Sequence, residues 1–264
     1  MNRIEKTLAV LQEKKEKAFI TYMTAGLPDY SKTKEIIKAQ EQAGTDIIEL
    51  GIPFSDPVAD GPVIQKASYD AILGGANLEK TFACLKELRD RGVEIPVVFM
   101  MYYNTILHYG LDAFADECKK SGVDGLIIPD LPFEEQEELL EALAGCDETI
   151  LIQLVSPVSA GRVEKILEHA RGFVYCVSSM GVTGQEGNFH KEVINYLSHV
   201  KQVSGVPVMM GFGIHRAEDV RPMKDIIDGA IVGSHFISLM RESGFSAQAA
   251  KEYCTAFKKE LNEL

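Results

Sequence analysis

Short apolar runs of four to seven residues alternate with longer amphipathic segments from one end of the chain to the other. This alternation is typical of parallel strands joined by crossover helices. With 264 residues, the chain is close to the roughly 250 residues typical of an eightfold α/β barrel. We therefore predict a single-domain (β/α)8 TIM barrel over residues 1–264. The eight strands are expected around residues 20–23, 47–49, 97–99, 126–128, 150–152, 174–176, 208–210 and 230–232.

The spacing of these runs predicts two enlarged loops. Most successive strand centres lie 22 to 28 residues apart, but 51 residues separate Ile48 from Phe99 and 34 separate Tyr175 from Met209. Both long steps follow the carboxyl end of a strand, the second and the sixth. Catalytic groups gather at that end of such barrels. We therefore expect the site among these loops.

Charge and composition exclude several classes of function. The net charge of −12 and pI near 5.0 argue against binding to nucleic acid or to an acidic membrane surface. Five scattered cysteines without CxxC spacing predict neither disulfides nor zinc, and indicate a cytoplasmic protein.

Residues 2–17 place Ile4, Leu8 and Leu11 at helical spacing among charges. They predict an extra amphipathic N-terminal helix and not a signal peptide.

Two carboxylates mark the end of the second strand. Glu49 is flanked by apolar residues in a strand buried on both faces, so burial should raise its pKa and let it hold and release a proton near neutral pH. Asp60 lies 11 residues later in a polar loop, where it should stay ionised. Acids in such different surroundings are typical of an acid and base pair. The motif alone equally allows a strand-end Glu paired with a cation and a loop Asp that caps a helix.

Glycines follow the last three predicted strands. Residues 178–188 form a glycine-dotted loop that could close over a ligand or simply be a solvent loop. Residues 211–213 read Gly-Phe-Gly, and Gly233-Ser234 precede a predicted helix over residues 236–241. Glycine turns and a helix N-terminus offer backbone N–H groups to an anion, so a phosphate site is expected here.

Other site classes lack their sequence patterns. The six histidines have no metal-ligand spacing, and there is no carboxylate cluster to complete a metal shell. His215 and His235 flank the expected phosphate site and could add charge there. No G-x-S-x-G elbow follows a strand. The sequence therefore predicts no metal.

The run at residues 49–61, ELGIPFSDPVADG, closely resembles the signature of the tryptophan synthase alpha chain family. Residues 129–132, 181–184, 211–213 and 233–234 resemble further motifs of that family, in the same order. The resemblance covers essentially the whole chain. It implies a carbon–carbon lyase that splits indole-3-glycerol phosphate into indole and D-glyceraldehyde 3-phosphate, the alpha reaction of L-tryptophan biosynthesis.

The resemblance also implies roles for individual residues. Glu49 would protonate the indole ring carbon and then take the proton of the adjacent side-chain hydroxyl, while Asp60 would hold the indole N–H. Substrate-binding positions would be Tyr22, Ile64, Met100, Ile127, Tyr175, Thr183 and Phe212. Phosphate-binding positions would be Gly184, Gly213, Gly233 and Ser234. Tyr22, Gln153 and Met180 depart from the family's pattern.

The family works as an α2β2 complex, so the resemblance implies a tryptophan synthase beta chain as partner. Pro53, Asp56 and Pro132 would face that partner. Pyridoxal phosphate is expected only in the beta chain, and no cofactor is expected in this one. Three other functions stay open at this stage: a self-sufficient lyase releasing indole, a sugar-phosphate aldolase or isomerase, and a non-catalytic activator of a beta chain.

Overall fold

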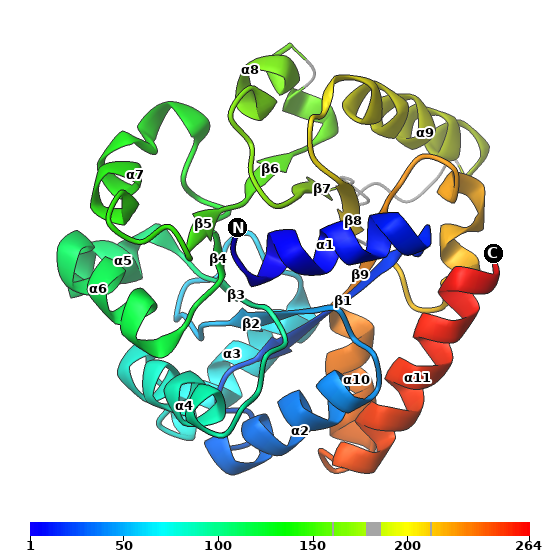
Figure 1. The fold of residues 1–264 in the computed structure, drawn as a ribbon. Coiled ribbons are helices and arrows are strands. Elements are labelled where there is room, and N and C mark those ends of the chain that lie inside the picture. Colours follow the sequence, from blue (N-terminus) through cyan, green and yellow to red (C-terminus); the bar gives the residue numbers. More distant parts are fainter. Residues whose placement is uncertain (160, 178–185, 212) are drawn as a thin grey trace.

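The computed structural model describes residues 1–159, 161–177, 186–211 and 213–264, except for the side chains of residues 186–191. Strands and helices alternate along these residues (Figure 1). The strands are β1 (Ala18–Thr24), β2 (Ile47–Gly51), β3 (Val97–Met100), β4 (Gly125–Ile127), β5 (Ile150–Leu151), β6 (Gln153–Val155), β7 (Val174–Val177), β8 (Val208–Gly211) and β9 (Gly229–Val232). The α-helices are α1 (Arg3–Lys14), α2 (Tyr30–Gln42), α3 (Pro62–Leu73), α4 (Leu78–Asp90), α5 (Tyr103–Tyr109), α6 (Leu111–Ser121), α7 (Glu137–Leu143), α8 (Val163–Leu167), α9 (Glu186–Val203), α10 (Ser234–Glu242) and α11 (Ala247–Glu263). Short 3-10 helices are η1 (Phe133–Glu135), η2 (Pro157–Ser159) and η3 (Ala217–Met223).

The strands form one parallel sheet that curls into a barrel, in the order β5-β4-β3-β2-β1-β9-β8-β7-β6. The two outer members, β5 and β6, are one run of chain interrupted at Ile152. β5 pairs with β4 and β6 with β7, while the Ile152 N–H donates to the Leu126 carbonyl at 2.9 Å. This run therefore joins both edges of the sheet. The predicted barrel is confirmed, and the fifth predicted strand counts as two because it changes partner midway.

Apolar side chains from nearly every strand fill the barrel interior. Each strand points alternate residues inward, and burying one such side chain stabilises the fold by about 1.5–3 kcal/mol. The inward set lies in one cluster with residues of α1: Ile4, Leu8, Leu11, Ala18, Ile20, Ile47, Val98, Ile127, Ile150, Ile152, Phe173, Tyr175, Met209 and Ile231. Helix α1 thus belongs to the interior core and is not an appendage.

Helix α1 lies across one mouth of the barrel (Figure 1). This is the end where the strands begin, because the Asn2 amide donates to the backbone carbonyls of Asp124 and Glu148, which precede β4 and β5. The Asn2 side chain also accepts from the Glu5 N–H, and the Glu5 carboxylate accepts from the Asn2 N–H. This capping box satisfies helix donors that lack partners. The predicted N-terminal helix is confirmed and closes the amino end of the barrel.

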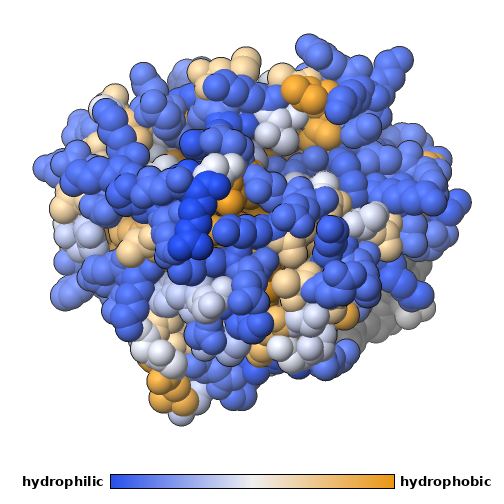
Figure 2. Space-filling model, turned by 60° about the horizontal axis from the view of Figure 1, so that its bottom comes forward, coloured by the Kyte–Doolittle hydropathy of each residue, from blue (hydrophilic) through white to orange (hydrophobic). Residues whose placement is uncertain are grey.

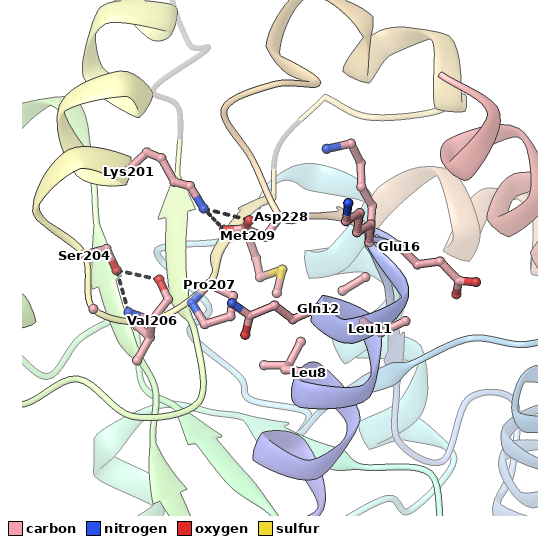
Figure 3. Close-up of a pocket in the computed structure, with 14 residues that line it drawn as sticks. Leu8, Leu11, Gln12, Glu16, Lys201, Ser204, Val206, Pro207, Met209 and Asp228 are labelled. Atoms are coloured by element: carbon pink, nitrogen blue, oxygen red, sulfur yellow. Dashed lines mark hydrogen bonds and ion pairs between the residues drawn. The ribbon is translucent and has the colours of Figure 1, made fainter.

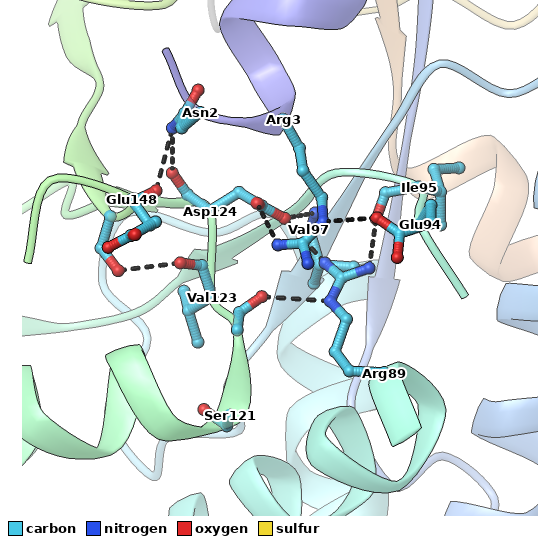
Figure 4. A network of polar contacts seen from close by, with 12 residues as sticks. Asn2, Arg3, Arg89, Glu94, Ile95, Val97, Ser121, Val123, Asp124 and Glu148 are labelled. Atoms are coloured by element: carbon cyan, nitrogen blue, oxygen red, sulfur yellow. Dashed lines mark hydrogen bonds and ion pairs between the residues drawn. The ribbon is translucent and has the colours of Figure 1, made fainter. Parts of the chain in front are cut away.

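A polar network at the amino ends of β3 and β4 stabilises this closed end (Figure 4). The Asp124 side chain is buried, and its carboxylate pairs with Arg89 at 2.7 Å and with Arg3 at 3.1 Å. It also accepts the Val97 N–H at 2.8 Å. Arg3 pairs with Glu94 as well. Each carboxylate oxygen of Asp124 therefore has a partner.

The two long steps in the sequence have different origins. Between β2 and β3 lie a long loop and two helices, α3 and α4, where one crossover helix would suffice. After β7, residues 178–185 fall outside the described part of the chain. Helix α9 begins at Glu186, so the prediction of a loop through residue 188 is wrong at its end.

The surface is largely hydrophilic, with hydrophobic residues in small separate groups on the face that Figure 2 shows. Exposed apolar side chains include Val58, Tyr69 and Leu73 near the loop after β2. Among the described residues, no helix is both long and apolar enough to cross a membrane.

Candidate active site

Glu49 lies near the carboxyl end of β2 and points into the barrel. It pairs in register with Tyr22 on β1 and Val98 on β3. Its side chain is fully buried, and neither carboxylate oxygen has a hydrogen-bond partner among the described residues. Burial raises its pKa to about 8. The sequence-based expectation of a buried acid with a raised pKa therefore agrees with the structure.

Asp60 lies in the loop between β2 and α3, held by a residue that the sequence analysis missed. The Tyr102 hydroxyl donates to Asp60 Oδ2 at 3.0 Å and accepts the Ala59 N–H at 2.9 Å. The Tyr102 ring stacks on Phe54, with ring centroids 5.0 Å apart. Tyr102 comes two residues after β3, and this strand-end position was the signal that could have identified it.

Burial raises the pKa of Asp60, and the Tyr102 hydrogen bond opposes that rise. The sequence had predicted a more polar setting. The difference arises because the loop folds back against Tyr102, which covers one side of the carboxylate. Glu49 and Asp60 nevertheless have distinct surroundings, since among the side chains that the structure describes, one donates a hydrogen bond to Asp60 and none to Glu49.

The described residues predicted to bind the ring lie at the same end of the barrel. Tyr22 packs in one cluster against Ile64 and Met100. Met100 also packs against the interior cluster that contains Ile127 and Tyr175. Together they enclose one side of Glu49 with apolar groups, which is the setting that a flat aromatic ring requires.

A cavity of about 340 Å3 adjoins these residues. Ala59, Met100 and Tyr175 line one part of it, and Pro132 and Gln153 line another. The Gln153 amide is buried, but it exchanges two hydrogen bonds with Gln136, at 2.9 and 3.3 Å. This polar departure from the family pattern is thus internally satisfied.

The described phosphate-binding candidates lie at the ends of β8 and β9. Gly213 has φ +67°, a conformation that favours glycine. Gly233 is the N-cap of α10 and Ser234 its first residue, and the Ser234 side chain is exposed. No side chain in the described part of the chain caps this helix, so its first N–H groups are available there to an anion. Thr183, Gly184 and Phe212 lie outside the described residues.

Two histidines stack beside this helix start. The His215 and His235 rings lie 5.1 Å apart, centroid to centroid, and are nearly parallel. Burial and the neighbouring His215 lower the pKa of His235. No group of three or more metal-binding side chains occurs in the described part of the chain.

Comparison with known proteins identifies the family. The family model described as "Tryptophan synthase alpha chain" matches residues 8–264. The tryptophan synthase alpha chain of Lachnospira eligens is 61% identical over 263 residues, covering 99% of this chain and all of that one. The alpha chain of Alkaliphilus metalliredigens is 44% identical, covering 100% and 98%.

The chain belongs to the tryptophan synthase alpha chain family. Solved structures agree: the alpha subunit of Legionella pneumophila superposes with a TM-score of 0.90 at 33% identity, with full coverage of both chains. A chain of Mycobacterium tuberculosis tryptophan synthase in its aminoacrylate-bound form gives a TM-score of 0.86 at 30% identity, covering 99% of this chain and all of that one. Members of this family are lyases that cleave indole-3-glycerol phosphate in tryptophan biosynthesis, and this is the reaction of this chain.

A second cavity, of about 410 Å3, lies at the closed end of the alpha-chain barrel (Figure 3). Leu8, Leu11 and Met209 form its apolar side, and an ion pair of 2.6 Å joins Lys201 to Asp228 at its edge. None of the described site residues lines it. The described site residues therefore lie apart from this cavity.

Proposed function

We propose that Glu49 and Asp60 carry out the cleavage of indole-3-glycerol phosphate as an acid and base pair. The observation that supports this most strongly is a fully buried carboxyl group that lacks hydrogen-bond partners among the described residues. Leaving such a group in a fold costs stability, so it needs a compensating role. Asp60 stands nearby in a setting that favours its charged form more, because Tyr102 donates to it.

Glu49 acts first as the acid. With a pKa near 8 it carries a proton at neutral pH and can give it to the indole ring carbon that bears the glycerol chain. Protonation of that carbon lets the ring accept the electron pair of the breaking carbon–carbon bond. The resulting Glu49 carboxylate then takes the proton of the adjacent side-chain hydroxyl, and the products are indole and D-glyceraldehyde 3-phosphate.

Asp60 stabilises the charge that develops on the ring. When the ring carbon is protonated, positive charge spreads to the indole nitrogen, and a carboxylate accepting the N–H offsets it. The hydrogen bond from Tyr102 holds the Asp60 carboxylate in position for this contact. The ring itself would lie among Tyr22, Ile64, Met100, Ile127, Tyr175 and Phe212, and Thr183 would bond to the Asp60 carboxylate.

The phosphate is assigned to the start of α10 and its neighbouring turns. Gly233, Ser234 and Gly213 offer backbone N–H groups without any Lys or Arg, and Gly184 would complete the set. The described members of this cradle, Gly213, Gly233 and Ser234, follow strands β8 and β9 at the same end of the barrel as Glu49. The cradle would therefore hold one end of the substrate while the apolar slot holds the other.

We further propose a tryptophan synthase beta chain as partner, in an α2β2 complex that receives the indole. The M. tuberculosis neighbour is itself a chain of tryptophan synthase. Asp56 and Pro132 are exposed and Pro53 is half-buried, all on loops at the open end of the barrel. Pyridoxal phosphate belongs to the beta chain in this proposal. We place the single-domain chain in the cytoplasm, where its five buried cysteines stay free thiols.

The test follows indole release from indole-3-glycerol phosphate, with and without a beta chain. The chain contains no Trp, so indole fluorescence reports on the ligand when no partner is added. Slow release that the partner accelerates, and that Glu49→Gln and Asp60→Asn each abolish, supports the proposal. Fast release without the partner indicates a self-sufficient lyase. Activation of the beta chain without any cleavage indicates a non-catalytic subunit.

A further inference from the structure

Tyr22 lies between the predicted ring slot and the predicted phosphate cradle. It is in register with Glu49 on the neighbouring strand, and both side chains point into the barrel. Its ring packs in a cluster with Ile64 and Met100. On its other side, a Cβ placed on Gly233 would lie 3.7 Å from the Tyr22 Cβ. The residue therefore borders the space that must hold the middle of the substrate.

The Tyr22 hydroxyl lies directly over the end of β2. A Cβ placed on Gly51 would come within 2.0 Å of that hydroxyl oxygen, so only glycine fits beneath it. Tyr175 is arranged in the same way on β7: a Cβ on Gly211 would come within 2.3 Å of its hydroxyl. Two glycines at strand ends thus make room for two phenols at the mouth of the barrel.

The Tyr22 phenol is a neutral donor close to both acids. Burial raises its pKa well above the ordinary value, and the charges of Asp60 and Glu49 raise it further. The hydroxyl therefore keeps its proton throughout the working pH range. A neutral donor beside two carboxyl groups suits a neutral acceptor on the substrate, such as an alcohol oxygen.

We propose that Tyr22 is a positioning residue for the glycerol chain of the substrate. This proposal rests on the proposed function. The Tyr22 hydroxyl donates to a glycerol hydroxyl of the substrate, because it lies over Gly51, two residues beyond Glu49 on the same strand. That bond fixes the rotation of the glycerol chain beside Glu49. Tyr22 itself transfers no proton.

The test compares two ligands in the Tyr22→Phe variant, which keeps the ring and removes only the hydroxyl. The first is indole-3-glycerol phosphate, and the second is 3-(indol-3-yl)propyl phosphate, which has the ring and the phosphate but neither glycerol hydroxyl. Loss of one hydrogen bond should lower kcat/KM for the substrate roughly 3- to 10-fold. The Kd of the analogue, measured by its indole fluorescence, should change less than about twofold, since it never makes that bond.

Tyr69→Phe serves as the matched control, because Tyr69 is an exposed tyrosine on α3 that takes no part in the proposed substrate site. Equal weakening of both ligands would overturn the proposal and show that the hydroxyl only shapes the slot. Unchanged values for both would also overturn it. Failure of the proposed function is a separate result, namely no cleavage by the unaltered chain. In that case calorimetric binding of the two ligands still tests Tyr22.

Discussion

The two ends of the barrel each contain a fully buried carboxylate, and they treat it in opposite ways. At the closed end, Asp124 has two arginines and a backbone N–H around its oxygens. At the open end, Glu49 has no hydrogen-bond partner among the described residues. Burial raises the pKa of both, but at Asp124 the Arg89 guanidinium opposes the rise. A satisfied buried charge is structural, and an unsatisfied one is available for chemistry.

The direction of the strands explains the difference. Asp124 precedes β4, where α1 and the end of α4 cover the barrel and bring Arg3 and Arg89 to it. Glu49 lies two residues before the end of β2, at the mouth where Met100 and Tyr175 border a cavity. Parallel strands thus separate stability from function at opposite ends of one core.

The largest effect that distinguishes Glu49 from Asp124 is on turnover. Glu49→Gln keeps the shape but cannot give up or accept a proton, so kcat/KM for indole release should fall by about 10²- to 10⁴-fold. Asp124→Asn, compared per folded molecule, should retain turnover within about threefold. Steady-state indole release measures both. Comparable losses in the two variants would remove the functional contrast between the ends.

The next effect is on stability. Asp124→Asn removes the charge that compensates Arg89, whose side chain is only 9% exposed. Removing one partner of a buried pair typically costs about 3–5 kcal/mol of unfolding free energy. Urea denaturation followed by circular dichroism should show that loss. A loss below about 1 kcal/mol would mean that the network contributes little.

Glu49→Gln should do the opposite and stabilise the chain at high pH. The pKa of Glu49 is raised from 4.5 to about 8 by folding, so the folded state binds more protons than the unfolded state between those values. Its contribution to unfolding free energy therefore falls as pH rises through this window. At pH 9 the variant should exceed the unaltered chain by at least about 2 kcal/mol, and the gain should vanish near pH 4. A pH-independent difference between their urea midpoints would contradict this.

Sequence alone predicted the barrel, the N-terminal helix and the burial of Glu49 with its raised pKa, because each depends on local patterns: apolar runs, helical spacing and an acid within an apolar strand. It did not predict the Tyr102 contact with Asp60 or the Arg3 and Arg89 pairs of Asp124. Those partners are distant in sequence, and only closure of the barrel brings them together. The loop predicted through residue 188 was wrong at its end for a local reason. Glycine at residue 187 is typical of loops, but this residue and its neighbours lie in helix α9.

A smaller effect concerns the partner of Asp60. Tyr102→Phe removes the hydrogen bond that opposes the rise in the Asp60 pKa, so that pKa should increase. Protonated Asp60 cannot accept the indole N–H, so the acid limb of the kcat/KM profile should move to higher pH. The maximal rate should fall by roughly tenfold, because the carboxylate loses its fixed position. A lower rate with an unmoved acid limb would make Tyr102 a packing residue only.

The smallest effect comes from the cap that joins α1 to the closed end. Asn2→Ala removes both halves of its bonding: acceptance from the Glu5 N–H and donation to the carbonyls before β4 and β5. Loss of an N-cap costs about 1 kcal/mol. Because α1 belongs to the same interior cluster as the residues beneath Glu49, the change should lower the thermal midpoint without altering kcat. Glu5→Gln is the matched control, since it keeps an acceptor in the capping box. If Asn2→Ala lowered kcat as well, the closed end would influence the open one through the core, and stability and function would not be separated along the barrel.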